Sequence, residues 1–286
     1  MKILVTGANG YMGTGIVKQL LSDGMEVIAT DFSTISVDEK AKRINSNIFK
    51  LTNPYEELGK PDVLLHLAWR DGFQHSSENH ILDLSNHYLF LRRMMEGGVK
   101  RVCVLGSMHE IGFFEGSINE NTPANPQSLY GISKNALRNA VHLMTNQYGA
   151  IFQWIRGYYI VGNTEQGCSV FSKLTQAEKE GKEFFPFTMG VNQYDFIDYD
   201  EFCYQVAAVV EQDAINGIIN CCTGAPMRLG ERMEKFICDN NYKIKLQYGA
   251  FPDRPYDSKA VWGDNRKINL ILKNKANGNE KNKGWN

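Results

Sequence analysis

The chain has 286 residues, 43% of them hydrophobic and 22% charged, so it is long enough to bury a sizeable core. Its 31 Lys and Arg residues balance 32 Asp and Glu residues, which argues against nucleic acid or an anionic membrane as partner. The apolar run in MKILVTGANG is too short for a signal peptide or a membrane span, so we expect a cytoplasmic protein. Six cysteines without a CxxC pair predict reduced, structural thiols.

Apolar runs of strand length alternate with segments of helix length along most of the chain. The predicted strands are 2–6, 26–30, 63–68, 101–106, 152–160 and 217–222. Continuous apolar strands separated by helices are typical of a parallel sheet covered on both faces. The sequence therefore predicts an α/β protein with a doubly wound parallel sheet, a Rossmann fold.

The domain organisation follows from where this pattern stops. We expect the sheet domain to span 1–164, with 191–223 contributing a late strand. A polar, helix-like insertion at 165–190 and the segment 224–272 are expected to form a smaller C-terminal substrate-binding lobe. The segment 273–286 is rich in Asn, Lys and Gly, which predicts a disordered tail.

A glycine-rich turn follows the first predicted strand and opens the first helix. Its glycines have the spacing GxxGxxG, which permits a tight turn and close approach of the backbone to a pyrophosphate at a helix N-terminus. The position between strand and helix favours dinucleotide binding over a merely structural turn. The predicted contacts are Gly7, Asn9, Gly10, Tyr11, Met12 and Gly13.

Asp31 ends the second predicted strand, some twenty residues beyond the glycines. A carboxylate at this place can accept hydrogen bonds from the adenosine ribose hydroxyls and repels a 2′-phosphate. No Lys or Arg occurs from Asp31 through Glu39 to attract that phosphate. We therefore predict NAD(H) rather than NADP(H), which stays the alternative; the competing role for Asp31 is capping a loop.

The fourth predicted strand places Ser107 at the carboxyl edge of the sheet, where ligands of doubly wound folds bind. Tyr130 and Lys134 lie four residues apart on a predicted helix, so they share one face. An ammonium group favours the phenolate and so lowers the pKa of a neighbouring phenol. Lys134 can also bond the nicotinamide ribose, and Ser107 can polarise a substrate carbonyl. These three residues are the predicted catalytic set.

Together with the run DVLLHLA at 62–68, these motifs resemble the extended short-chain dehydrogenase/reductase family over nearly the whole chain. The family includes nucleotide-sugar epimerases, dehydratases and ketoreductases. YDFIDYDEF at 194–202 and RPYDSKAVWGDNRKI at 254–268 resemble later stretches of the family. The resemblance implies a nucleoside-diphosphate sugar (a dTDP- or UDP-hexose) as substrate, with Arg254 holding its diphosphate.

Further site residues follow from the same resemblance. Leu67, Ala68 and Trp69 are expected at the cofactor, with loop surface as the alternative role for Trp69. The expected substrate contacts are Ser107, Met108, His109, Tyr159 and Arg254. His109 is either a second proton carrier or, as we prefer, a hydrogen-bonded structural histidine. His80 and His87 lack the carboxylates typical of a metal site, so we predict no metal.

Departures from the family narrow the expected reaction. Ser107-Met108-His109 stands where sugar 4,6-dehydratases carry Thr-Asp-Glu, which argues against elimination of water. HLAWRDGFQH, SMHEIGFFEG and the short C-terminal lobe resemble reductases of dTDP-4-dehydro-6-deoxyglucose, which make dTDP-6-deoxyhexoses such as fucose for surface polysaccharides. We therefore expect NAD(P)H-dependent reduction of the 4-keto group of a nucleoside-diphosphate 4-keto-6-deoxyhexose. The alternatives are an NAD-dependent 4-epimerase of the UDP-glucose/UDP-galactose type and a non-catalytic NAD(H)-binding regulatory protein.

Assembly is also suggested by the resemblance. The helices expected at about 79–96 and 128–147 resemble those that pack in this family against their symmetry mates as a four-helix bundle. Their apolar positions occupy more than one face, which favours a homodimer over packing in the chain's own core alone. These positions include Leu84, Leu91, Leu137, Val141 and Met144.

Overall fold

The computed structural model describes residues 1–162, 164, 167–252 and 258–283. Over these residues, seven strands form one large sheet in which all neighbours are parallel. Their order in space is β11-β7-β5-β4-β1-β2-β3. The strands are β1 (Lys2–Thr6), β2 (Glu26–Asp31), β3 (Lys42–Asn45), β4 (Val63–His66), β5 (Arg101–Ser107), β7 (Ile151–Gly157) and β11 (Gly217–Cys221).

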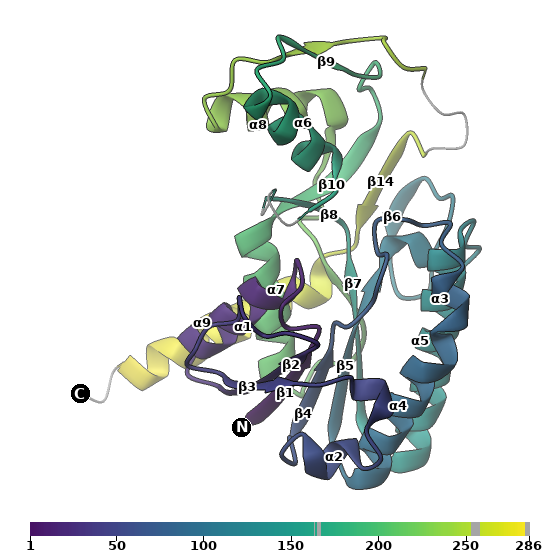
Figure 1. The fold of residues 1–286 in the computed structure, drawn as a ribbon, viewed down its shortest axis with the longest axis vertical. Coiled ribbons are helices and arrows are strands. Elements are labelled where there is room, and N and C mark those ends of the chain that lie inside the picture. The colour runs from purple at the N-terminus through teal and green to yellow at the C-terminus, as the bar shows by residue number, and fades with distance from the viewer. Residues whose placement is uncertain (163, 165–166, 253–257, 284–286) are drawn as a thin grey trace.

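Helices cover both faces of this sheet (Figure 1). One layer holds α1 (Gly13–Ser22), α7 (Tyr199–Glu211) and α9 (Arg266–Lys283), which bury residues such as Ile16 and Val206 against the sheet. The other layer holds α2 (Pro54–Glu57), α3 (Asn79–Leu82), α4 (Leu84–Gly97) and α5 (Leu129–Tyr148). The short helix η1 (Ile48–Lys50) precedes α2 in the chain. The strand order reverses between β1 and β4, the switch point at which doubly wound folds bind ligands. The predicted fold class is confirmed.

The sheet contains one strand that the sequence did not predict. In β3, with the sequence KRIN, only Ile44 is even partly buried, because the strand lies at the edge of the sheet. It therefore lacks the apolar run that marks a strand covered on both faces. The predicted strand 152–160 is divided in the structure into β7 and β8 (Tyr159–Val161).

A smaller lobe stands beyond the carboxyl ends of the large sheet (Figure 1). Its main sheet has the order β12-β10-β14-β6, with β8 paired to β10. A second sheet pairs β13 with β9, and two helices pack on the lobe core. The elements are β6 (Gly116–Ile118), α6 (Val170–Lys179), β9 (Phe184–Pro186), β10 (Gln193–Asp198), β12 (Pro226–Arg228), α8 (Leu229–Asp239), β13 (Lys245–Gln247) and β14 (Ala260–Gly263).

The lobe therefore draws on more of the chain than the sequence indicated. The ranges 191–223 and 116–118 were counted with the sheet domain; β11 does join the large sheet, but β10 and β6 belong to the smaller sheet. The segment after residue 223, where the strand pattern appeared to stop, contributes three short strands. Strands of three or four residues carry too few side chains to show an alternating pattern.

The C-terminal segment also differs from the expectation of a disordered tail from residue 273. The helix α9 continues through this segment to Lys283. Ile268 and Ile271 bury its first turns in the core, and Lys275 pairs with both Asp23 and Glu211 at 2.8 Å. Tertiary packing thus overrides a polar composition here.

Across the described ranges, no helix combines the length and apolar character needed to cross a membrane.

Four of the five apolar positions offered as evidence for a dimer lie in the chain's own core. Leu91, Leu137 and Val141 are fully buried, and Met144 is nearly so. Leu84 packs against the same cluster from its margin. These residues therefore do not themselves supply a surface for a partner.

Candidate active site

The three predicted catalytic residues meet at the carboxyl end of β5. Ser107 is the last residue of that strand, and α5 begins beside it with Tyr130 in its first turn and Lys134 one turn later. Ser128 caps the helix by accepting a hydrogen bond from the Gly131 N–H at 3.1 Å. The Ser107 side chain faces the Tyr130 hydroxyl and acts to lower the pKa of the phenol. The Lys134 ammonium lies 5.9 Å from the centre of the Tyr130 ring.

Burial controls the protonation of both Tyr130 and Lys134. It raises the pKa of the Tyr130 phenol, and the Ser107 side chain only partly opposes this effect. It lowers the pKa of Lys134 to about 7, against the opposing charge of Glu110. We expected the ammonium to lower the phenol pKa, but desolvation is the larger effect. Tyr130 is therefore a protonated phenol at pH 7, as an unperturbed phenol would also be, and burial makes its phenolate harder to form.

The glycine turn lies tightly against the loop that follows β4. Gly7 has φ +67°, and a Cβ there would come within 2.7 Å of the Ala68 backbone nitrogen. A Cβ on Gly13 would lie 2.2 Å from the Gly7 carbonyl oxygen, so α1 begins directly on the turn. Leu67 and Ala68, both predicted at the cofactor, form the facing wall. This close backbone packing fits a site for the pyrophosphate of a dinucleotide.

The carboxylate of Asp31 is held beside this turn at the end of β2. It accepts hydrogen bonds from the Asn9 N–H at 3.1 Å and from the Phe32 N–H at 2.8 Å. The Asn9 side chain in turn accepts one from the Ser36 N–H at 2.8 Å. Asp31 thus organises its own loop and also stands where the adenosine ribose of a dinucleotide is expected.

Tyr11 and Met12 continue the turn toward the other parts of the site. Met12 is the N-cap of α1. The Tyr11 hydroxyl donates to the Gly162 carbonyl at 2.8 Å, and its backbone carbonyl accepts from the Tyr199 hydroxyl at 2.6 Å. The Tyr11 ring meets Phe73, from the loop after β4, edge to face at 5.7 Å. Tyr11 therefore connects the glycine turn with two other loops at the sheet edge.

Histidines surround Tyr130, and of these only His109 was among the site residues predicted from the sequence. The His75 ring stacks on the Tyr130 ring at 4.9 Å and 10°, and the His75 carbonyl accepts the Tyr130 N–H at 3.0 Å. His80 meets the Tyr130 ring edge to face at 5.2 Å, and His109 meets it at 6.2 Å. These contacts join residues from three separate segments, so spacing along the chain gives no sign of them.

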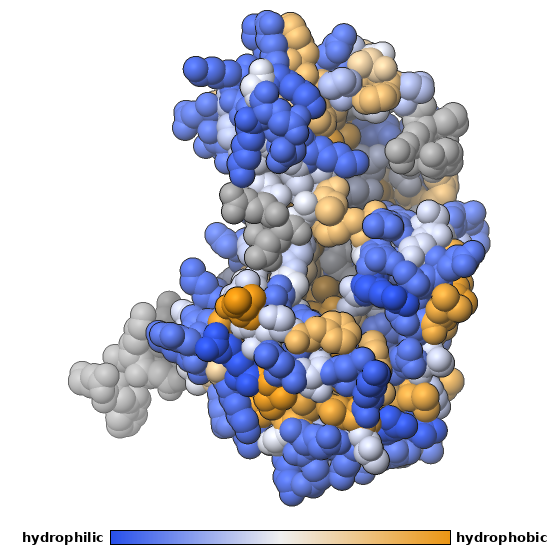
Figure 2. All heavy atoms as spheres, in the orientation of Figure 1, coloured by the Kyte–Doolittle hydropathy of each residue, from blue (hydrophilic) through white to orange (hydrophobic). Residues whose placement is uncertain are grey.

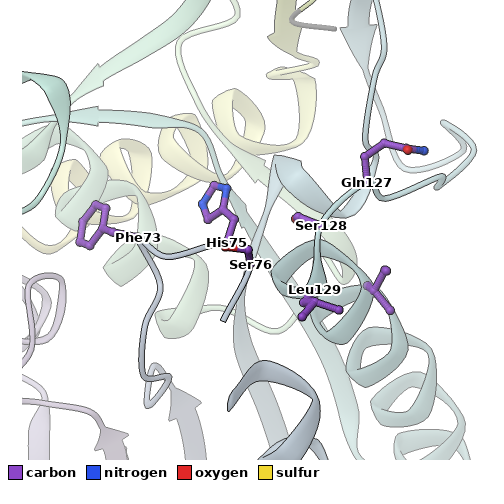
Figure 3. A pocket seen from close by; sticks show the side chains of 7 residues that line it. Phe73, His75, Ser76, Gln127, Ser128 and Leu129 are labelled. Carbon is purple, nitrogen blue, oxygen red and sulfur yellow. The ribbon is translucent and has the colours of Figure 1, made fainter. Parts of the chain in front are cut away.

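A hollow of about 500 Å³ opens between the loop after β4 and the start of α5 (Figure 3). Phe73 and His75 come from the loop, and Ser128 and Leu129 come from the helix. On the face shown in Figure 2, the surface is also recessed between the smaller lobe and the main body. The hollow lies next to Tyr130, although Tyr130 is not among its lining residues.

The predicted substrate contacts lie in different environments. His109 and Tyr159 approach each other at 6.4 Å on the side facing the smaller lobe. Burial lowers the pKa of His109 to about 3, so it is neutral at pH 7 and ill suited to donate a proton as imidazolium. Met108 is buried in the core of the smaller lobe. Arg254 lies outside the described residues.

Sequence reasoning missed Glu110, which orders the end of β5. It closes a capping box on the short helix η2 (Met108–Glu110), and its carboxylate accepts the Ser107 N–H at 2.6 Å. It is fully buried and faces Arg138 at 3.4 Å and Arg156 at 3.7 Å. The signal for it was present, because SMHE has the Ser-x-x-Glu pattern of a capping box.

In the part of the chain that the structure describes, no group of three or more His, Cys, Asp or Glu side chains is placed to hold a metal ion.

Comparison with known proteins assigns this fold and site to a family. Residues 3–222 match the model of the NAD dependent epimerase/dehydratase family. The chain is 41% identical over 270 residues to a dTDP-6-deoxy-L-talose 4-dehydrogenase (NAD(+)) from Aggregatibacter actinomycetemcomitans, covering 92% of this chain and 99% of that protein. It is 24% identical to an uncharacterized UDP-glucose epimerase from Bacillus subtilis, over 76% of this chain and 75% of that protein.

Solved structures of similar fold include a UDP-glucose 4-epimerase from Thermotoga maritima with UDP-glucose, with a TM-score of 0.80, 21% identity and coverage of 94% of this chain and 92% of that one. A dTDP-glucose 4,6-dehydratase from Streptomyces venezuelae with NAD bound has a TM-score of 0.79 and 20% identity, covering 94% and 90%. The chain belongs to the NAD-dependent epimerase/dehydratase family and is an enzyme of that family. The predicted family and NAD as its cofactor are confirmed.

Proposed function

We propose that this enzyme interconverts a dTDP-6-deoxyhexose and its 4-keto form with NAD(H), in the synthesis of surface polysaccharide precursors. The observation that carries the proposal is the 41% identity to the dTDP-6-deoxy-L-talose 4-dehydrogenase, which extends over nearly the full length of both proteins. The UDP-glucose epimerase from Bacillus subtilis is similar at 24% and over a smaller share of the chain. The relative's sugar narrows the expected 4-keto substrate to one derived from a 6-deoxy-L-hexose.

The catalytic residues suit proton transfer at the C4 oxygen of such a sugar. Bound NADH supplies a hydride to C4. In the direction of reduction, Tyr130, a protonated phenol at neutral pH, donates its proton to the oxygen that becomes the C4 hydroxyl, and in oxidation the proton returns to Tyr130. The Ser107 hydroxyl, which faces the Tyr130 hydroxyl, hydrogen-bonds the same oxygen and stabilises its developing charge. Lys134 binds the nicotinamide ribose and compensates the phenolate that Tyr130 leaves behind.

The cofactor preference follows from the same side of the site. Asp31 presents a carboxylate where a 2′-phosphate would have to lie, and its two backbone hydrogen bonds keep it there. We therefore propose NADH rather than NADPH as the reductant. An epimerase would use the same three catalytic residues, so the assay has to distinguish the two reactions directly.

The test measures absorbance at 340 nm with purified protein. We expect NADH to form from NAD⁺ and dTDP-6-deoxy-L-talose, and NADP⁺ to react more slowly. Parallel reactions contain dTDP-4-keto-6-deoxyglucose with NADH or NADPH, and UDP-glucose or UDP-galactose without added reductant. Epimerisation causes no net change in NADH, so interconversion of the UDP-sugars is followed by chromatography; if they interconvert while no dTDP-sugar changes the absorbance, the enzyme is an epimerase. No turnover of any dTDP-sugar would overturn the proposed reaction.

A further inference from the structure

The Lys134 ammonium rests on the face of an aromatic ring. Its Nζ lies 3.8 Å from the centre of the Trp69 ring, and it donates one hydrogen bond to the Leu105 carbonyl at 2.8 Å. The side chain is almost completely buried. An indole face attracts an ammonium through its quadrupole, and the attraction is strongest where water is excluded.

Trp69 itself is fixed by two histidines. Its indole N–H donates to His80 Nδ1 at 3.0 Å, and the ring stacks on His87 at 4.5 Å and 17°. Because an indole N–H only donates, His80 must accept at Nδ1 and carry its own proton on Nε2. That Nε2 donates to the Gln74 carbonyl at 3.0 Å. The orientation of the indole is therefore set by directional contacts and not by packing alone.

The hydrogen bonds behind this ring join further buried histidines. His87 Nδ1 and His66 Nε2 lie 2.9 Å apart, and His66 Nδ1 lies 2.8 Å from the Thr6 hydroxyl oxygen. Burial lowers the pKa of His66 to about 3 and that of His87 well below its ordinary value. Both rings are neutral at pH 7, so they support Trp69 without repelling the ammonium in front of it.

The charge state of Lys134 is finely balanced. Burial brings its pKa to about 7, so the lysine could lose its charge near neutral pH. The groups that face it are the carboxylate of Glu110, the ring of Tyr130, and the neutral imidazoles of His66 and His87. Of the titratable groups, only Glu110 carries a charge that favours the ammonium, and it is already shared with two arginines. The indole face adds a second favourable contact.

We infer that Trp69 is a positioning residue that keeps the Lys134 side chain charged and in place beside Tyr130, an inference that rests on the proposed function. Trp69 occupies the turn directly after β4, and its ring also meets Tyr130 edge to face at 6.2 Å. The ammonium is needed when the phenol has given up its proton, because it then compensates the phenolate. Loss of the ring face should therefore weaken the proton-transfer step.

The test compares Trp69→Leu, Trp69→Phe and the matched control Trp262→Leu, which truncates a half-buried tryptophan in β14. The measurement is the pH dependence of kcat for reduction of the 4-keto sugar. Without the ring face, the ammonium is lost at lower pH, so the fall in rate at high pH moves down by about one pH unit in Trp69→Leu. Trp69→Phe keeps a weaker aromatic face and should shift less, and Trp262→Leu should not shift.

A shift in the opposite direction would overturn the inference, because it would mean that Trp69 acts only by excluding water. An unchanged profile would overturn it as well. If Trp69→Leu does not fold, Trp69→Phe still has to show the smaller downward shift.

A second readout needs no substrate. In protein labelled with ¹³Cε-lysine, NMR titration gives the pKa of Lys134 directly, with Lys134→Met identifying its signal. We expect this pKa to fall in the same order, first Trp69→Phe and then Trp69→Leu. An absence of dTDP-sugar turnover in the wild type would disprove the proposed reaction and leave this titration interpretable. Normal turnover with an unmoved Lys134 signal would disprove only the role of Trp69.

Discussion

The adenosine end of the proposed cofactor site uses segments close together in the chain, whereas the proposed substrate side is assembled from distant ones. The glycine turn and Asp31 lie within the first 31 residues and meet because β1 and β2 are adjacent. The smaller lobe instead pairs β6 with β14, which joins Gly116 to Val261. Local motifs therefore suffice to specify one half of the site, and long-range contacts specify the other.

One buried carboxylate connects the separate pieces of the lobe. Asp195 in β10 accepts hydrogen bonds from the N–H groups of Thr223 and Gly224 at 2.9 Å and of Gly263 at 3.0 Å. It is fully buried, so each bond also repays part of the cost of desolvating its charge. Asp195 thus has for the lobe the organising role that the glycine turn has for the cofactor side.

The catalytic residues between the two halves should give the largest effect. Tyr130→Phe removes the proton donor and leaves the ring that packs on His75. We expect kcat to fall by about 10² to 10⁴, while the dissociation constant for NADH, measured by fluorescence titration, changes little. Turnover close to that of the wild type would show that another group carries the proton.

Asp195→Asn should weaken substrate binding by the lobe more than it weakens NADH binding. The amide removes a charged acceptor, and its own N–H₂ faces backbone donors, so we expect a loss of about 3 kcal/mol in the free energy of unfolding. Urea denaturation measures this loss. KM for the dTDP-sugar should rise more than the dissociation constant for NADH. The control is Asp213→Asn, because Asp213 is exposed and lies 3.8 Å from Arg101, a surface pair worth less than about 1 kcal/mol. Equal changes in KM for the dTDP-sugar and in the dissociation constant for NADH would contradict the proposed division of the site.

The same division explains how much could be predicted from the sequence. The glycine turn, Asp31 and the Tyr130/Lys134 pair could be proposed from the sequence because their spacing within one segment is itself the signal. The histidines around Tyr130 were not placed, because their contacts depend on how the loop after β4 folds over α5. The edge strand β3 and the helix α9 were missed for a related reason, since each is held by neighbours more than by its own apolar content.

Asp31→Ala should have a smaller effect, confined to the cofactor side. Without the carboxylate, the ribose hydroxyls lose a charged acceptor for their hydrogen bonds. This loss should weaken NADH binding about tenfold and reduce discrimination against NADPH. Parallel fluorescence titrations with the two cofactors measure both changes. Asp38→Ala is the matched control, since the Asp38 carboxylate accepts a bond from the Lys40 N–H in the same loop. An unchanged preference would remove Asp31 from the predicted ribose site.

The outer faces of α3 and α5 carry the prediction of a homodimer, although Ile132 also lines the hollow beside Tyr130. Although the apolar residues first considered are in the core, Leu82, Ile132 and Leu143 are exposed by 65%, 43% and 71%. Ile132 and Leu143 are eleven residues apart, about three helical turns, so they lie on one face of α5.

A two-fold contact would use this face twice, and light scattering should then give about twice the 32.4 kDa mass of one chain. Leu143→Lys should return the mass to that of one chain and change kcat by less than about threefold, because Leu143 lies more than two helical turns beyond Lys134 on α5. A wild-type mass near 32.4 kDa at micromolar concentration would contradict the dimer. A monomeric variant with a large loss of kcat would instead mean that the partner helps to shape the site, and the division into a local and an assembled half would have to include the second chain.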